Sequence, residues 1–400
     1  GDLEGRGVTR MANTKAPKIK QTLDPESESW NQLPWRKFEQ QVYRIQKRIF
    51  KAKQRGNQRA VHKLQKLLMK SRAARLLAVR RVTQDNQGKK TAGVDGVKSV
   101  PPMQRLDMAE RIHPKCWKQR QSPPVRRIYI PKPGKTEKRP LGIPVMEMRA
   151  LQALAKGALE PEWEACFEAN SYGFRPGRSC QDAIQAIFLS ICKKPKYVLD
   201  ADIAGCFDNI NQEALLSKLN TYPAMRRLVH SWLKAGMMDQ GVFAPTSRGT
   251  PQGGVVSPLL MNVALHGLET FVVHELTRRA GKPSRKVSPT VIRYADDFVV
   301  FDEELRIIEQ AKGIISTWLK DMGLELKPSK THITHTLEPC QEMIGFDFLG
   351  WTVRQFPVGK THTGTDRWGN ALGFKTIITP SKEAVKRHIQ EVKALIRKNS

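Results

Sequence analysis

The sequence lacks paired cysteines and long apolar stretches. Its six cysteines are scattered, with no two in a C-x-x-C arrangement, which argues against a disulfide framework or a cysteine zinc site and is typical of a reducing compartment. No apolar run reaches the length of about 18 residues that a membrane span needs, and no secretory apolar segment lies near the start. We therefore expect a cytoplasmic protein with no membrane partner, and Met11 as a candidate natural start.

The sequence also has few acids for its many bases. Lys and Arg number 68 against 38 Asp and Glu, which gives a formal charge of +30 and a pI of about 10.1. Such an excess repels itself in a compact fold, so it indicates a polyanionic partner. The alternative is a generic basic protein kept soluble by its charge.

The positive charge is concentrated near the N-terminus. Between Arg36 and Arg81 there are sixteen Lys or Arg residues and one acid, Glu39. Apolar residues recur there at steps of three and four, which predicts two amphipathic helices separated at Gly56-Asn57. Helices with nearly unopposed positive charge suit a phosphate backbone, whereas a solvated helix face, the alternative, normally mixes signs.

The order of the predicted elements indicates an α+β fold of the split βαβ type. A polar stretch, 1–29, is expected to be a disordered leader, and a basic helix is expected at the C-terminus. The elements expected between them are a hairpin (126–144), helices (147–168 and 179–193), a strand (196–202), a helix (211–219), two short strands (291–301), a helix (303–321) and two strands (323–334 and 346–354).

Two acidic segments interrupt apolar sequence. In VIRYADDFVVF (291–301), the apolar flanks favour strands and aspartate favours turns, so Asp296 and Asp297 are predicted at the tip of a tight hairpin. In YVLDADIAGCFDNI (197–210), an apolar strand carries Asp200, Asp202 and Asp208 around its end. Adjacent aspartates in a turn are usually structural, but two such segments in a strongly basic chain favour a shared chemical role.

Crowded carboxylates repel one another unless a cation lies between them. Hard oxygen ligands suit Mg²⁺, which proteins hold with one or two carboxylates plus substrate phosphates. Two such ions, about 3.5–4 Å apart, form the metal pair of phosphoryl transfer. The sequence therefore predicts a two-magnesium site.

Seven blocks in order resemble those of the group II intron-encoded reverse transcriptases, also called maturases. They are RPLGIP (139–144), SYGFRPGRS (171–179), DIAGCFDNI (202–210), GTPQGGVVSP (249–258), YADD (294–297), LKPSKT (326–331) and FLGW (348–351). Each block alone would be weak evidence, but together, in order, they are specific.

The resemblance implies a right-hand polymerase with fingers, palm and an α-helical thumb. We expect a basic helical N-terminal extension (30–95), fingers with part of the palm (96–195), the palm with its catalytic carboxylates (196–355), and a linker with the start of the thumb, or maturase, domain (356–400). Only that beginning of the thumb is expected in this sequence, with no DNA-binding or H-N-H nuclease region.

The resemblance also implies roles for the carboxylates and their neighbours. Asp202 and Asp296 match the family's ligands for both metal ions, and Asp297 completes the acidic triad, which leaves Asp200 and Asp208 as second choices. Five residues after Asp202, Phe207 matches the aromatic that would clash with a 2′ hydroxyl and so selects deoxynucleotides; its alternative is core packing. Gln252 is expected to touch the nucleotide or the template–primer.

Basic residues around the blocks are expected to contact phosphates. Lys132 and Arg139, on opposite arms of the hairpin, could close over a triphosphate, although Lys132 could equally lie in a solvated turn. Arg175 and Arg178 are expected on the template backbone, with local salt bridges as the alternative, and Lys330 is a further candidate for an RNA or primer contact. The pair His332 and His335 would face opposite sides of a strand, which speaks against a shared metal.

By this resemblance the protein is an RNA-directed DNA polymerase that binds its intron RNA, assists splicing and copies the intron during retrohoming. Its partners would be intron RNA, an RNA template with a DNA primer, dNTPs and target DNA, in a bacterial or organellar ribonucleoprotein. The alternatives are an RNA-binding splicing factor with an idle polymerase site, a retron or CRISPR-associated reverse transcriptase, and an RNA-dependent RNA polymerase.

Overall fold

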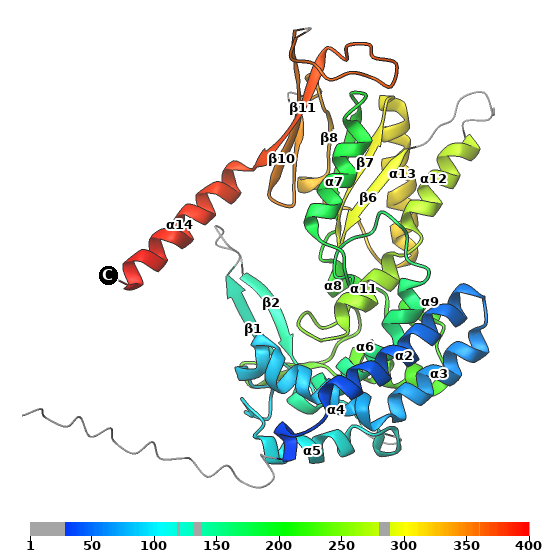
Figure 1. The fold of residues 1–400 in the computed structure, drawn as a ribbon, viewed down its shortest axis with the longest axis vertical. Helices are drawn as coiled ribbons and strands as arrows, with labels where there is room; N and C mark the ends of the chain where they lie inside the picture. The colour runs from blue at the N-terminus through cyan, green and yellow to red at the C-terminus, as the bar shows by residue number, and fades with distance from the viewer. Residues whose placement is uncertain are drawn as a thin grey trace, which may run out of the picture.

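A computed structural model describes residues 29–117, 121–131, 138–279, 289–341, 343–359 and 361–399 of the chain. The expected leader, except Ser29, and Lys132 in the basic hairpin turn lie outside these ranges. Figure 1 shows a mainly helical half at the bottom, a half built on a sheet above it, and a C-terminal helix that diverges from both. The fold is α+β, as the sequence predicts.

The lower half is built on helices around one core. The helices are α2 (Trp35–Gln54), α3 (Gln58–Lys70), α4 (Arg72–Arg80), α5 (Pro102–Arg111) and α6 (Met146–Glu164). The first three cover the region in which two helices were expected. The extra break comes at Ser71, whose extended backbone ends α3 and whose side chain caps α4 by accepting a hydrogen bond from the Ala74 amide at 3.4 Å.

Directly after α4 the chain forms a π-helical turn, η1 (Arg81–Asp85). π-helical turns are rare overall, and many of those that occur lie at functional sites. The predicted hairpin follows as β1 (Val125–Pro131) and β2 (Lys138–Ile143), and a short pair, β4 (Met237–Asp239) and β5 (Val242–Ala244), extends the sheet in the order β2-β1-β4-β5.

The upper half contains a four-stranded antiparallel sheet in the order β6-β7-β3-β8. Its strands are β3 (Tyr197–Asp202), β6 (Thr290–Tyr294), β7 (Asp297–Asp302) and β8 (His332–His335). Leu199 and Phe298 face the main core, in which α13 (Leu305–Asp321) packs, and Val198 and Phe301 face a second core that includes α7 (Cys180–Ile191). Both faces are therefore covered, and only the strand ends are free for chemistry.

One predicted strand is much shorter than expected. Of the range 323–334 only the last three residues lie in a strand, β8 (His332–His335), because Pro328 opens a 3-10 turn (Pro328–Lys330) and cannot donate to a sheet. His332 is exposed and His335 is buried, with its ring nitrogen accepting from the Glu338 amide at 2.9 Å. The two histidines therefore face opposite ways, as predicted.

The helices between β3 and β6 connect the two halves. They are α8 (Cys206–Asn209), α9 (Gln212–Leu219), α10 (Pro223–Leu233), α11 (Ser257–Leu265) and α12 (Leu268–Arg279). Of these, only the region of α9 was predicted as a helix. Because α9 and α11 supply fully buried apolar side chains to the main core, the sheet and the helical half are joined by a continuous interior.

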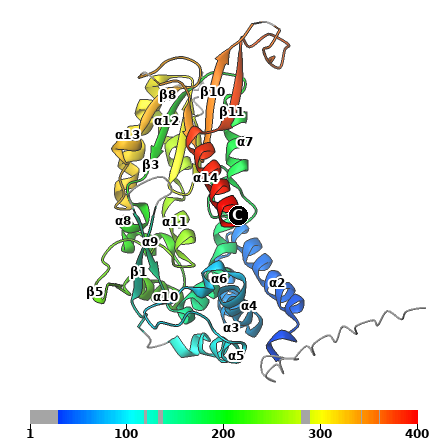
Figure 2. The ribbon, with the colours of Figure 1, turned by 90° about the vertical axis from the view of Figure 1, so that its left-hand side faces the viewer.

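The chain ends in a third sheet and a helix. The sheet has the order β11-β10-β9, with β9 (Phe346–Phe348), β10 (Trp351–Pro357) and β11 (Phe374–Pro380), and the predicted final helix is α14 (Lys382–Asn399). Figures 1 and 2 show α14 leaving the body on the side where β11 ends. None of the helices within the described ranges has the length and apolarity to cross a membrane.

Candidate active site

The YADD segment forms the turn between β6 and β7. Tyr294 pairs with Asp297, so Ala295 and Asp296 are the two residues of a tight hairpin loop. Ala295 has a φ of +60°, the pattern of a type II′ turn, in which glycine is the usual residue. The predicted hairpin tip is confirmed: Asp296 lies in the turn and Asp297 begins the returning strand, both half-buried.

The second acidic segment meets the first across the sheet. Asp202 is the last residue of β3 and lies opposite Asp297 in the antiparallel register. Side chains opposed in this way have Cβ atoms about 4.5–5.5 Å apart. Three carboxylates from two distant segments therefore meet at one end of the sheet. Asp200 lies one full pleat back along β3, and Asp208 lies beyond the strand in α8.

The carboxylates change one another's protonation. Burial, the charges of Asp296 and Asp202, and a hydrogen bond with Asp202 raise the pKa of Asp297 to about 7. Burial, followed by the negative charge of Asp202, raises the pKa of Asp296. Burial and the charges of Asp202 and Asp347 also raise the pKa of Asp200 to about 7. The cluster therefore carries more negative charge than its surroundings easily stabilise.

One cation already contacts this cluster. The Lys330 ammonium lies 2.6 Å from Oδ2 of Asp202. Burial opposes the charge on Lys330, but the hydrogen bond with Asp202 and the three nearby carboxylates raise its pKa. Lys330, which we expected to contact nucleic acid, is thus the counter-ion of Asp202 in this structure.

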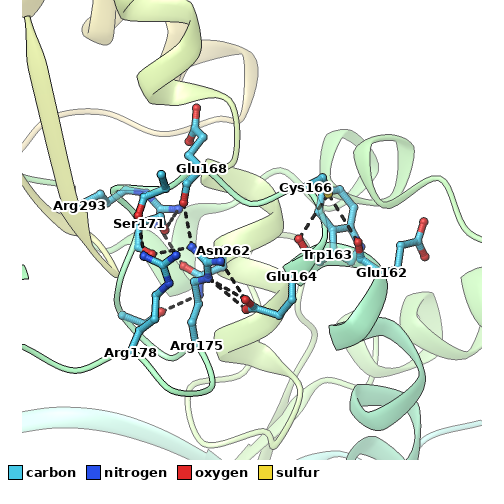
Figure 3. Close-up of polar contacts among 12 residues, drawn as sticks. Glu162, Trp163, Glu164, Cys166, Glu168, Ser171, Arg175, Arg178, Asn262 and Arg293 are labelled. Carbon is cyan, nitrogen blue, oxygen red and sulfur yellow. Dashed lines mark hydrogen bonds and ion pairs between the residues drawn. The ribbon is translucent and has the colours of Figure 1, made fainter. Parts of the chain in front are cut away.

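A buried network supports the YADD turn from behind. The Arg293 guanidinium, 3% exposed, donates to the Ala295 carbonyl at 2.9 Å, to Asn262 Oδ1 at 3.0 Å and to Ser171 Oγ at 2.7 Å. Figure 3 shows Arg293, Asn262 and Ser171 converging from three separate segments. This network fixes the carbonyl of the residue directly before Asp296.

Gly173 joins the same network through a hydrogen bond with Asn262 and a close backbone approach to Ala295. The Asn262 side-chain amide donates to the Gly173 carbonyl at 2.8 Å. A Cβ atom at position 173 would lie 2.4 Å from the Ala295 amide nitrogen, closer than real Cβ contacts allow. Only glycine lets the SYGF segment approach the turn this closely.

A cavity of about 590 Å³ collects three of the four residues expected to bind nucleotide, and its lining includes Phe174, the neighbour of the Gly173 that approaches the YADD turn. Arg139, Phe207 and Gln252 line it. The Phe207 ring also packs edge-on against Phe174, with ring centroids 6.5 Å apart, and the Gln252 amide lies 3.4 Å from an Asp208 oxygen. The fourth residue, Lys132, lies outside the described residues.

Sequence reasoning missed other residues that line this cavity. Arg81 and Asn86 reach it from the π-helical turn and its end, Lys156 from α6, and Phe174 from the SYGF segment. Phe174 stood inside a block that we had quoted, and its positive φ of 58° marks an unusual backbone. The contributions of Arg81 and Lys156 depend on tertiary packing and have no local signal.

The comparisons with known proteins agree with this geometry. A family model described as reverse transcriptase (RNA-dependent DNA polymerase) matches residues 130–353, more than half of the chain. The chain belongs to the reverse transcriptase family. A second model, the N-terminal domain of reverse transcriptase, matches residues 30–112.

Relatives of this chain include intron-encoded proteins, which confirms the resemblance drawn from the blocks. The group II intron-encoded protein LtrA of Lactococcus lactis subsp. cremoris is 30% identical over 335 residues, which cover 69% of this chain and 54% of that protein. Protein YkfC of Escherichia coli (strain K12) is 32% identical over 305 residues, covering 68% of this chain and 77% of that protein. Our chain thus spans about half the length of the lactococcal relative.

Solved structures give a more distant likeness. Apo telomerase from Candida tropicalis, truncated from its C-terminal domain, matches with a TM-score of 0.44 and 15% identity over 59% of this chain and 55% of that one.

The donor set suits the divalent metal ions that reverse transcriptases use. Within the described ranges no three His, Cys, Asp or Glu side chains are arranged to hold a metal ion by themselves. Magnesium does not require such a cage, because it takes one or two carboxylates and completes its shell with water and substrate phosphates. Crowded aspartates with raised pKa values supply the hard oxygens and the negative charge that such an ion neutralises.

The two arginines of the SYGFRPGRS block are engaged within the protein. Every guanidinium nitrogen of Arg175 donates, to both oxygens of Glu164 and to the carbonyls of Glu168 and Ser171. Arg178 donates to the Ala169 carbonyl at 2.6 Å and lies over the Tyr172 ring. Figure 3 shows both side chains directed into this local network. The two roles considered for these arginines were a contact with the template backbone and local salt bridges. The structure supports the local role, most strongly for Arg175, which is 7% exposed.

The raised pKa of Asp297 predicts a pH-dependent stability. Between its ordinary value of 3.8 and about 7, the folded protein holds a proton that the unfolded chain has released. The free energy of unfolding should therefore fall as the pH rises through this window. In urea unfolding with chelator present, the free energy of unfolding of Asp297→Asn should fall less steeply with pH than that of wild type. The two slopes should differ by at most ~1.4 kcal/mol per pH unit. Asp321→Asn, at an exposed position, should keep the wild-type slope, and equal slopes for wild type and Asp297→Asn would contradict the assignment.

Proposed function

We propose that this chain is an RNA-directed DNA polymerase that copies RNA by extending a DNA primer with dNTPs. The observation that carries the proposal is the meeting of Asp202, Asp296 and Asp297 at one sheet end, together with a cavity lined by Arg139 and Phe207. Membership of the reverse transcriptase family supports it.

The proposed chemistry is an in-line attack of the primer 3′ hydroxyl on the α-phosphate of a dNTP, with pyrophosphate as the leaving group. Asp202 and Asp296 would hold two magnesium ions and Asp297 would complete the site. When bound, these ions supply the charge that activates the hydroxyl and stabilises the leaving oxygen. The chain itself positions the carboxylates: Arg293 holds the two-residue turn through the Ala295 carbonyl, and the turn places Asp296 directly before the Asp297 that lies opposite Asp202.

The nucleotide would occupy the cavity lined by Arg139 and Phe207. Arg139 is exposed on β2 and its positive charge favours the ionised form of Asp296, so its guanidinium is near enough to act on a triphosphate there. Gln252 lies on a loop that approaches β2 closely, since the Gly142 amide donates to the Gln252 carbonyl at 2.5 Å. Phe207 would lie under the sugar.

The RNA partner would bind the basic N-terminal helices. The side chains of Lys47 and Lys51 on α2, and of Arg55 directly after it, are exposed, and only one acid opposes the sixteen bases of this region. An unopposed row of cations binds phosphates through counterion release. We assign this extension (30–95) to intron RNA, with fingers (96–195), palm (196–355) and the start of the thumb (356–400) following.

The proposed biological role is that of an intron-encoded ribonucleoprotein. The protein would bind its intron RNA, assist its splicing and copy it into target DNA during retrohoming. This part of the proposal rests on the relatives, among them the maturase-like protein 1 of Euglena gracilis, which is 27% identical over 325 residues.

Primer extension on poly(rA)/oligo(dT) with Mg²⁺ tests the proposal. The wild-type chain should incorporate dTTP, and the product should depend on both template and primer. If it makes no DNA while promoting splicing of the intron RNA, the protein is an RNA-binding splicing factor with an idle site and the polymerase assignment fails.

Replacing Phe207 tests how the site selects its sugar. Phe207→Ala should lower the preference for dNTPs over rNTPs by ~10-fold or more, because removal of the ring leaves room for a 2′ hydroxyl. The preference is measured as the ratio of kcat/KM values in primer extension. Phe271→Ala removes an exposed ring on α12 and should leave the ratio unchanged. An unaltered ratio in Phe207→Ala would assign the ring to packing only.

A further inference from the structure

The loop between β10 and β11 carries an exposed tryptophan. This β10–β11 loop comprises residues 358–373, of which all but 360 are described. Trp368 is 70% exposed, although tryptophan is normally among the most extensively buried side chains. Figures 1 and 2 show the loop projecting at the top of the molecule, beyond the end of the sheet.

The exposed ring is held on an ordered turn. Asp366 accepts hydrogen bonds from the Trp368 amide at 2.8 Å and from the Asn370 amide at 2.9 Å, and its second oxygen accepts from the Asn370 side chain at 2.9 Å. Gly369, with a φ of +86°, completes the turn. Because these contacts involve only the turn itself, the fold keeps Trp368 in place without covering it.

The stem of the loop is ordered as well. Its two sides are joined by hydrogen bonds from Leu372 to Gly364 at 3.0 Å and from Val358 to Gly373 at 3.0 Å. Lys193, two residues after α7, donates to the Thr365 carbonyl at 2.6 Å and so ties the loop to the body. The tryptophan is thus a preformed contact surface, and ordering it would cost a ligand little entropy.

The charges around this ring favour an anionic ligand. The Arg367 guanidinium lies 4.0 Å from the centre of the Trp368 ring, and it is the ring's only aromatic or cation–π contact within the described residues. Lys193 and Lys375 add positive charge at the base of the loop. The acid of the turn, Asp366, has both oxygens engaged by its own backbone and by Asn370.

We propose that Trp368 and Arg367 form a binding site for an unpaired base of single-stranded RNA. The free face of the indole would stack on the base, and Arg367 would contact the adjacent phosphate. An exposed aromatic next to an arginine is the arrangement by which proteins hold single strands without reading their sequence. The inference rests on the proposed function, in which RNA is a partner, and adds a second contact region at the far end of the molecule from the N-terminal helices.

Crosslinking tests where the base lies. A single-stranded RNA oligonucleotide substituted with 5-iodouridine should crosslink under ultraviolet light to the peptide that contains Trp368, as mapped by mass spectrometry. The full 400-residue chain is used. Crosslinks confined to other peptides would overturn the site.

Affinity measurements test how the site binds. By fluorescence anisotropy, Trp368→Ala should weaken binding of the single strand by about 5- to 100-fold, the loss that corresponds to one stacked base. Trp368→Phe should retain most of the affinity, and Arg367→Gln should reduce the salt dependence by about one phosphate contact. Leu189→Ala, which removes an exposed apolar side chain from α7, should change nothing.

Two further measurements distinguish this site from a general loss of RNA binding and from the polymerase site. Duplex RNA, whose bases are already stacked, should bind Trp368→Ala as it binds wild type; an equal loss for both RNAs, or no loss for either, would overturn the proposal. Primer extension on a short template should be unaffected by Trp368→Ala. A chain that makes no DNA but shows the expected loss of single-strand affinity would reject the polymerase assignment and retain this site.

Discussion

Replacing Asp296 by asparagine should reduce primer extension about 10³-fold or more, a loss of about 4 kcal/mol of transition-state stabilisation. The change keeps the size of the side chain and removes one of three converging negative charges. It leaves the turn intact, because the network holds the carbonyl of Ala295 and does not involve the Asp296 side chain. The rate is measured with saturating template–primer and dTTP.

Stability and a matched control distinguish this loss from unfolding. Burial and the charge of Asp202 raise the pKa of Asp296, so Asp296→Asn should melt at or above the temperature of wild type in chelator at pH 8. Asp321→Asn removes an exposed carboxylate at the end of α13 and should keep full activity. Activity within tenfold of wild type in Asp296→Asn would remove this residue from the catalytic site.

Gly173→Ala should lower kcat by about 10²-fold while leaving KM for the template–primer nearly unchanged. The added methyl group would overlap the backbone of Ala295, with only 2.4 Å to its amide nitrogen. Because both partners are main chain, the turn that carries Asp296 must shift, and a displacement of about 1 Å at a reacting centre can cost 10²-fold in rate. Steady-state kinetics of primer extension give both constants.

A second glycine supplies the control for this substitution. Gly313 lies in the exposed part of α13, where a Cβ atom would meet nothing within 4 Å. Gly313→Ala should keep full activity and raise the free energy of unfolding by about 0.5–1 kcal/mol, since alanine is the better helix former. If Gly173→Ala retains wild-type kcat, the close approach does not position the turn.

The sequence predicted the acidic centre well because its signal is local. Aspartates are costly inside apolar strands, so their position between VIRY and FVVF predicts a turn, which holds for Asp296, while Asp297 begins the returning strand and pairs in register with Asp202. The hairpin β1–β2 and helices α6, α7 and α13 were predicted from local sequence as well, and α7 also has an end signal, the capping box of Ser179 and Asp182.

Other features depend on contacts that no single segment reveals. Strand β11 (FKTIITP) was not predicted, although it is rich in residues that favour strands, and β10 pairs with it along its whole length. The local role of Arg175 follows from Glu164, which only the fold brings to it. The cavity residues Arg81 and Lys156 belong to helices whose packing sets where their side chains point. Lys330, a candidate RNA or primer contact in the sequence, is the ion-pair partner of Asp202 in the structure.

The backbone of Ala295 leaves this position little freedom to vary. Its left-handed φ would suit glycine better, yet its methyl group, in a residue only 5% exposed, fills the space directly above Gly173. Glycine here would relax the chain and open a void, whereas any bulkier residue would push the two segments apart. The two positions therefore constrain each other's evolution. A larger residue at position 173 or at position 295 would move the Asp296 carboxylate.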